Sequence, residues 1–151
     1  MIERFSRFSC AISDISRYWH KIATEEMKKY GLRGTHAIYL TTLYRYPEGL
    51  TAVGLCEHCG KDKADVSRMM NIMENLGLVE KEDNVKSQYR VRLRLTDAGR
   101  EAAEQVAKRA AIAVEHGGSG ISEENRRIFY ETLETIASNL YELSEEGLPK
   151  E

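Results

Sequence analysis

The chain has 151 residues, of which 42% are hydrophobic and two are prolines, which excludes a disordered chain and allows one domain with a buried core. Its formal net charge of −2 does not by itself predict a polyanionic partner. No apolar run reaches membrane-spanning length, and the opening MIERFSRFSC lacks the apolar segment of a signal peptide, so we expect a cytoplasmic protein with no membrane partner.

The first part of the chain predicts two helices. Apolar residues recur three and four positions apart along the first segment, which is the pattern of a long amphipathic helix. They are Phe5, Phe8, Ile12, Ile15, Trp19 and Ile22. Gly31 and Gly34 end this helix, and Thr35 is the expected N-cap of a second helix that runs to about Tyr46.

Two short helices and a hairpin are expected next. A helix over 51–58 is broken at Gly60, and Asp62 caps a further helix that stops at Gly77. The runs LVEKE (78–82) and YRVRLRL (89–95) read as two strands joined by a turn. Two helices separated by a short glycine-containing turn have the spacing of a helix-turn-helix, and a hairpin directly behind them makes it winged.

Two more helices complete the chain. Thr96 caps an alanine-rich helix that ends at HGGSG (116–120), and the last helix begins at Ser122. In the last helix, apolar residues follow a four-three-four-three spacing: Phe129, Leu133, Ile136, Leu140 and Leu143. Both terminal stripes suit helix-on-helix packing between two copies, although they could also cover the core of a monomer.

The expected fold class is therefore mainly α with a small β-hairpin wing. We expect a single domain over 1–151, with a winged helix-turn-helix over 35–96. The helices over 1–34 and 97–151 would form a dimerisation region.

The second helix of the helix-turn-helix has a polar face typical of DNA recognition. When Val66, Met69, Met70 and Met73 face the core, the opposite face carries Lys63, Ala64, Ser67, Arg68 and Asn71. Arginine can bind guanine, asparagine can pair with adenine, and alanine can meet a thymine methyl group. Lys61 and the amides at the helix start could hold phosphates. The alternative is an ordinary solvated helix, which Asp62 and Asp65 favour because carboxylates repel phosphate.

The wing has an unusual concentration of positive charge. Residues 84–94 include four bases and no acids, whereas from residue 97 onward acids outnumber bases two to one. One explanation is a ladder of ion pairs, with Glu82 opposite Arg90 and Glu80 opposite Arg92, each pair contributing about 0–1 kcal/mol. A surplus of bases remains, so we expect the wing tip to meet the DNA backbone or minor groove. The expected tip residues are Lys86, Ser87, Gln88 and Arg90.

The runs GLTAVGLCEHCGKDKADVSRMMNIMENLGLVEKED (49–83) and YRVRLRLTDAGREAAEQV (89–106) resemble the MarR family of bacterial winged helix-turn-helix transcription regulators. The resemblance implies a non-enzymatic repressor that binds a pseudo-palindromic operator in double-stranded DNA as a homodimer and is released by a small-molecule effector. The family often carries Asp-x-Arg in the wing, where this chain has Ser87 and Tyr89. Lys86 or Arg90 would then replace the usual arginine.

The resemblance also implies an effector pocket between the dimerisation helices and the winged region. The residues that could line it are Trp19, His20, His36, Tyr39 and Tyr44. The sequence does not identify the effector.

The cysteines leave one alternative function open. CEHC (56–59) has no second ligand pair at zinc-finger spacing, so we expect no metal and no cofactor, and we expect Cys56 and Cys59 to be structural. A thiol oxidoreductase would require a βαβ setting that this chain lacks, so we expect no enzyme. Some family members sense peroxide through a cysteine in the first helix, which keeps a redox-sensing regulator acting through Cys10 as an alternative.

A second alternative function rests on the arginines of the wing. In this alternative the chain is a winged-helix module whose arginines bind an acidic protein.

Overall fold

The computed structural model describes residues 2–82 and 91–149. Its internal contacts divide the chain into two units, one ending at Ala113 and the other beginning at Val114. The elements in chain order are α1 (Ile2–Met27), η1 (Lys28–Tyr30), η2 (Gly34–His36), α2 (Ala37–Arg45), α3 (Ala52–Cys59), α4 (Lys63–Asn75), β1 (Val79–Lys81), β2 (Leu93–Leu95), α5 (Asp97–Gly117) and α6 (Glu123–Glu146). The prediction of a mainly helical, winged fold is confirmed.

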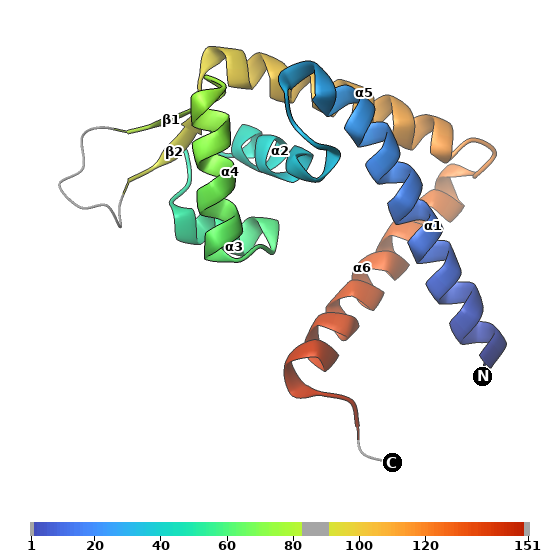
Figure 1. Cartoon of the computed structure of the whole chain (residues 1–151). Helices are drawn as coiled ribbons and strands as arrows, with labels where there is room; N and C mark the ends of the chain where they lie inside the picture. The colour runs from blue at the N-terminus through green and yellow to red at the C-terminus, as the bar shows by residue number, and fades with distance from the viewer. Residues whose placement is uncertain (1, 83–90, 150–151) are drawn as a thin grey trace. The chain divides into compact units, whose positions relative to one another are not determined.

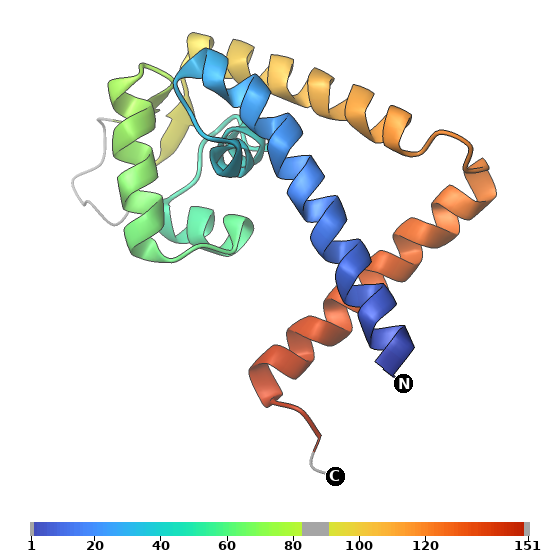
Figure 2. The same ribbon diagram turned by 45° about the vertical axis from the view of Figure 1, so that its right-hand side comes forward.

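The helix-turn-helix consists of α3 and α4, which lie against each other, with β1 and β2 continuing from the C-terminal end of α4 (Figures 1 and 2). Gly60 ends α3 in the left-handed conformation, with φ of 60°, which glycine adopts without the steric cost of a side chain. Asp62 then starts α4, since its Oδ1 accepts a hydrogen bond from the Asp65 amide at 2.8 Å. These two residues set the turn between the helices, as the sequence predicts.

Two other predicted helix starts are confirmed. Thr96 Oγ1 accepts from the Gly99 amide at 3.0 Å at the start of α5. Ser122 Oγ accepts from the Asn125 amide at 3.3 Å at the start of α6. Each hydroxyl oxygen accepts a hydrogen bond from an amide that lacks a partner within its own helix.

The predicted N-cap at Thr35 is wrong. Thr35 lies inside the short helix η2, and His36 takes the N-cap position of α2. The cause is local, because the Arg33 amide donates to His36 Nδ1 at 3.1 Å and closes a tight turn before α2 begins.

The core of the first unit packs α4 against the other helices and the wing strands. Its largest fully buried side chains are Tyr39, Met27, Leu40, Leu43, Leu55, Met73 and Val66. The predicted inner face of α4 is buried, with Val66 and Met73 at 0% and Met69 and Met70 at 3% exposure. Burying each such side chain stabilises the fold by about 1.5–3 kcal/mol. The α4 helix therefore has a fixed rotation about its axis.

The wing register differs from the prediction by two residues. Glu80 lies opposite Arg94, not Arg92, and Arg94 Nε donates to Glu80 Oε1 at 2.7 Å. The Glu82 amide donates to the Arg92 carbonyl at 3.0 Å. Arg90, the predicted partner of Glu82, lies outside the described residues. The Arg92 guanidinium instead donates to the carbonyl of Gly49 at 2.8 Å.

A segment outside the hairpin explains this register. Leu50 pairs with Leu93 as an antiparallel bridge, through two backbone hydrogen bonds of 2.8 and 3.0 Å. At the base of the wing, the Thr96 hydroxyl donates to the Gly77 carbonyl at 2.6 Å. Of the predicted strand 89–95, β2 comprises only Leu93–Leu95, and residues 89 and 90 lie outside the described residues.

The second unit contains the end of α5 from Val114 onward, the turn that follows it, and α6. Arg126 donates to the Gly118 carbonyl at 3.2 Å and pairs with Glu123 at 3.4 Å. Within Glu123–Glu146 no side chain is buried, including those of the predicted apolar stripe. Over residues 2–82 and 91–149, no helix combines the length and apolar character needed to cross a bilayer.

Candidate nucleic-acid interface

The outer face of α4 carries the residues predicted to contact DNA. Lys63, Ala64, Ser67, Arg68 and Asn71 are all exposed on it, and the preceding Lys61 is exposed too. This placement follows from the burial of the opposite face, since a helix has 3.6 residues per turn. Their position agrees with the prediction, while their role in DNA binding remains a prediction.

A concave surface lies between α4, the start of α3 and the wing. It is a cavity of about 460 Å³. Its lining residues are Ala52, Val53, Lys63, Val66, Ser67, Met70, Asn71, Lys81, Val91 and Leu93. The structure therefore brings Lys63, Ser67 and Asn71 together around one hollow. The predicted wing contacts at Lys86, Ser87 and Arg90 lie outside the described residues.

The Asp65 carboxylate has two defined partners beneath this face. The Tyr39 hydroxyl donates to Asp65 Oδ2 at 2.7 Å, and Arg68 Nη2 donates to Asp65 Oδ1 at 3.4 Å. The hydrogen bond from Tyr39, followed by the one from Arg68, lowers the pKa of the Asp65 carboxyl. Burial, followed by the bond to Asp65, raises the pKa of the Tyr39 hydroxyl. At neutral pH the pair is therefore a carboxylate and a neutral phenol.

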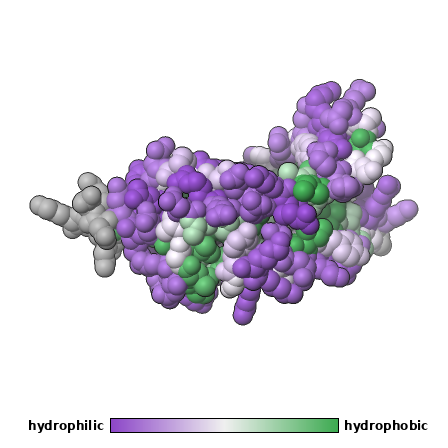
Figure 3. Space-filling view, turned by 90° about the horizontal axis from the view of Figure 1, so that it is seen from above, coloured by the Kyte–Doolittle hydropathy of each residue, from purple (hydrophilic) through white to green (hydrophobic). Residues whose placement is uncertain are grey.

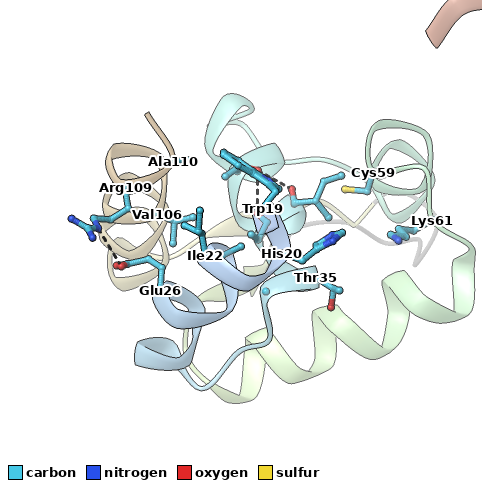
Figure 4. A pocket seen from close by; sticks show the side chains of 15 residues that line it. Trp19, His20, Ile22, Glu26, Thr35, Cys59, Lys61, Val106, Arg109 and Ala110 are labelled. Carbon is cyan, nitrogen blue, oxygen red and sulfur yellow. Dashed lines mark hydrogen bonds and ion pairs between the residues drawn. The ribbon is translucent and has the colours of Figure 1, made fainter. Parts of the chain in front are cut away.

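A second cavity, of about 380 Å³, lies within the first unit between α1, α2 and α5 (Figure 4). Its lining residues are Trp19, His20, Ile22, Ala23, Glu26, Gly34, Thr35, Ala37, Ile38, Thr41, Cys59, Lys61, Val106, Arg109 and Ala110. In Figure 4 the Glu26–Arg109 ion pair, 3.7 Å between its charged atoms, lies on one side of the cavity. Cys59 and Lys61 lie on the other.

Two of the five predicted effector residues, Trp19 and His20, line this cavity. Among the described residues that line it, His36, Tyr39 and Tyr44 do not appear. Tyr39 is in the core and Tyr44 is 40% exposed on α2, because α2 turns other side chains toward the cavity.

Several residues of this cavity are not among those predicted from the sequence. Ile38, Thr41 and Arg109 all line it. The spacing of Gly34, Ile38 and Thr41 by four and three is a helical signal that could have identified this face.

The cysteines differ in environment. Cys59 is 5% exposed, its thiol lies 3.6 Å from the Thr42 hydroxyl, and burial raises the pKa of that thiol. Cys56 is partly buried against the same core, whereas Cys10 is exposed on α1. The environments of Cys56 and Cys59 support structural roles. No three His, Cys, Asp or Glu side chains of the described chain converge as metal ligands.

These features define a winged helix-turn-helix protein with a polar outer face on its second helix. Residues 30–87 match the model of the MarR family. The resemblance to this family of transcription regulators is therefore confirmed.

Solved MarR-type regulators have the same fold. One from Methanosarcina mazei Go1 is 23% identical, with a TM-score of 0.80, over 91% of this chain and 99% of that one. One from Listeria monocytogenes, solved with a 26mer DNA, is 19% identical, with a TM-score of 0.79, over 93% and 95% of the two chains. The MepR chain in the MepR–DNA complex of Staphylococcus aureus is 19% identical, with a TM-score of 0.79, over 88% of this chain and 97% of that one.

Proposed function

We propose that this chain is a sequence-specific DNA-binding transcription regulator. It acts as a homodimeric repressor on a pseudo-palindromic operator and is released by a small-molecule effector. The observation that carries the proposal is the outer face of α4, whose cationic, amide and hydroxyl side chains stand on a helix that the core holds in a fixed rotation. The similar proteins solved with DNA support the same role.

The outer face of α4 has the chemistry for reading bases. Arg68 can donate two hydrogen bonds to guanine O6 and N7, and Asn71 can pair with adenine N6 and N7. The Lys63 ammonium and the Ser67 hydroxyl can add further hydrogen bonds to the DNA. This face carries a guanidinium, an amide, an ammonium and a hydroxyl group. These groups can bind base edges as well as phosphates, so the helix can distinguish one DNA sequence from another.

At the base of the wing, the arginine side chains bind other groups of the same chain. Arg92 and Arg94 are bound to Gly49 and Glu80. We therefore assign phosphate binding to Lys61 and to the wing-tip residues Lys86, Ser87 and Arg90.

Exposed apolar side chains support the homodimer. Along α1, the predicted stripe from Phe5 to Ile22 is between 41% and 69% exposed. On α6, Phe129 and Leu140 are 45% and 50% exposed. The face drawn in Figure 3 is largely hydrophilic, with hydrophobic groups gathered in patches. Monomers rarely leave large apolar patches in water, so a second copy of the chain is the proposed cover.

The cavity between α1, α2 and α5 supports the effector. Its volume of about 380 Å³ suits a small organic molecule. Lys61, which precedes the N-cap residue of α4, and Trp19 of α1 both line it. A ligand there would contact both the proposed dimerisation helix and the start of the DNA-reading helix.

The test is a fluorescence-anisotropy titration of the protein against the intergenic DNA upstream of its own gene and against a scrambled duplex. Both titrations are run at low and near-physiological salt. We expect tight, salt-sensitive preference for the upstream DNA, because released counterions contribute to the affinity. Equal binding to both duplexes would contradict sequence-specific regulation at that site, and salt-sensitive binding to an acidic protein instead would support the protein-interaction alternative.

A further inference from the structure

Asp65 is a carboxylate in the first turn of α4, where the proposed DNA phosphates approach. A free carboxylate there would oppose binding. Asp65 is not free, however, because its two oxygens are divided between Tyr39 and Arg68 at 2.7 and 3.4 Å. Its backbone amide is also held, by the Asp62 side chain at 2.8 Å. This arrangement gives Asp65 a defined orientation.

Tyr39 supplies the rigid end of the contact. It comes from α2, is 1% exposed, and ranks among the largest fully buried side chains of the core. A buried aromatic ring packed on all sides has one orientation. Its hydroxyl therefore directs Asp65 Oδ2 inward and leaves Oδ1 toward the outer face of α4.

Arg68 is the exposed end of the contact. Its side chain is 72% exposed, and Asp65 Oδ1 is the acceptor that limits its positions. A long exposed arginine otherwise samples many rotamers, and ordering it on binding reduces affinity. A neighbouring carboxylate that is itself fixed from the core can order the guanidinium before DNA arrives.

We propose that Tyr39 and Asp65 are positioning residues for Arg68. Tyr39 fixes the Asp65 carboxylate, and the carboxylate orients the Arg68 guanidinium toward the position where it reads a base. The inference rests on the proposed function, because it assigns base reading to Arg68. It also explains why a helix that contacts DNA carries an acid in its first turn.

The first test is a double-mutant cycle on sequence specificity, taken as the ratio of Kd for scrambled DNA to Kd for the operator. Tyr39→Phe keeps the buried ring and removes the hydroxyl. It should lower the ratio by about three- to tenfold, the range expected for one lost hydrogen bond to a charged network. In an Arg68→Ala background, the same change should alter the ratio by less than about twofold, because coupled residues are not additive. Equal effects in both backgrounds would overturn the proposal.

The matched control is Tyr44→Phe. Tyr44 lies on the same helix and is 40% exposed, so losing its hydroxyl should leave the ratio unchanged. Thermal unfolding of each variant shows that the fold is retained.

The second test needs no DNA. The NMR order parameter of the Arg68 Nε–H group is measured in the free protein and in Tyr39→Phe. A clear decrease in Tyr39→Phe supports positioning, even if the wild-type protein shows no preference for the operator, an outcome that would reject the proposed function alone. An unchanged order parameter overturns the positioning role whatever the DNA result.

Discussion

Arg68 has the largest expected effect on base reading of any single residue on the outer face of α4. It is highly exposed and carries the only guanidinium within Lys63–Asn75. Arg68→Ala should weaken operator binding by about 1–3 kcal/mol and weaken binding to scrambled DNA less. Anisotropy titration on both duplexes measures the two losses.

Arg45→Ala serves as the control for this prediction. Arg45 ends α2 and is exposed, so its removal changes the charge equally without touching the outer face of α4. It should leave the ratio of the two affinities unchanged. Equal losses on both duplexes for Arg68→Ala would remove Arg68 from base reading.

The Asp65 pKa gives a second prediction at the residue scale. The hydrogen bond from Tyr39 is the largest cause of the lowered Asp65 pKa, so Tyr39→Phe should raise that pKa toward its ordinary value. A group with a lowered folded-state pKa stabilises the fold above its unfolded pKa and loses that contribution as pH falls through the folded value. The stability difference between wild type and Tyr39→Phe should therefore shrink as the solution is acidified.

Carboxyl ¹³C NMR titration of Asp65, with chemical unfolding at several pH values, measures both effects. An Asp65 pKa that does not move in Tyr39→Phe would show that Arg68 and Lys61 keep it low without the Tyr39 hydroxyl.

The same pair shows what the sequence could and could not predict about the site. The two faces of α4 follow from the spacing of its apolar residues, so periodicity alone predicts that Arg68 and Asn71 lie on the outer face. For Tyr39, by contrast, the sequence predicts a possible effector contact. Its true partner, Asp65, lies 26 positions away, and a contact at that separation depends on how α2 and α4 pack, which periodicity does not reveal.

At the scale of elements, the wing illustrates the same limit. Alternation identified the strands, but β1 and β2 have three residues each, too few for their side chains alone to specify a register. The register depends on Leu50 and on the Arg92 contact to Gly49, both supplied by a segment some forty positions earlier. A hairpin considered in isolation could not show this.

Close approach of α5 to the wing base leads to a stability prediction. A Cβ at Gly99 would overlap the backbone carbonyl of Leu78, and backbone cannot move aside as a flexible side chain can. Gly99→Ala should therefore destabilise the first unit by about 1–3 kcal/mol, the usual cost of overpacking. Urea denaturation followed by circular dichroism measures the change.

Gly117→Ala, in the same helix, is the matched control. A Cβ there would meet no described atom within 4 Å, and alanine is favoured over glycine in a helix by roughly 0.5–1 kcal/mol. The control should be neutral or stabilising. Equal destabilisation by both substitutions would show that the cost arises in the helix and not at the contact with Leu78.

At the scale of the whole molecule, burial is uneven along the chain. Core side chains of the winged region are almost fully buried, whereas α6 has no buried residue and the apolar stripe of α1 is exposed. This contrast separates the part of the chain that has a buried core from the part for which we propose a partner copy. It also means that a substitution on the stripe can test assembly without disturbing the core.

Ile15→Asp is that substitution. Ile15 is 58% exposed, so a charge there costs little in a monomer but would be buried unpaired in a dimer, at a penalty of several kcal/mol. Light scattering after size exclusion should show wild type at twice the chain mass of 17.2 kDa and Ile15→Asp at that single mass, with helical circular dichroism retained. Ser13→Asp, exposed on the same helix but off the stripe, should remain a dimer. A wild-type protein that is monomeric at operator-binding concentrations would contradict the homodimer.

The Ile15→Asp variant also tests why a dimer is needed. If this variant is monomeric and binds only a half-site, recognition of a pseudo-palindromic operator depends on the dimer, since two recognition helices must bind at a fixed spacing.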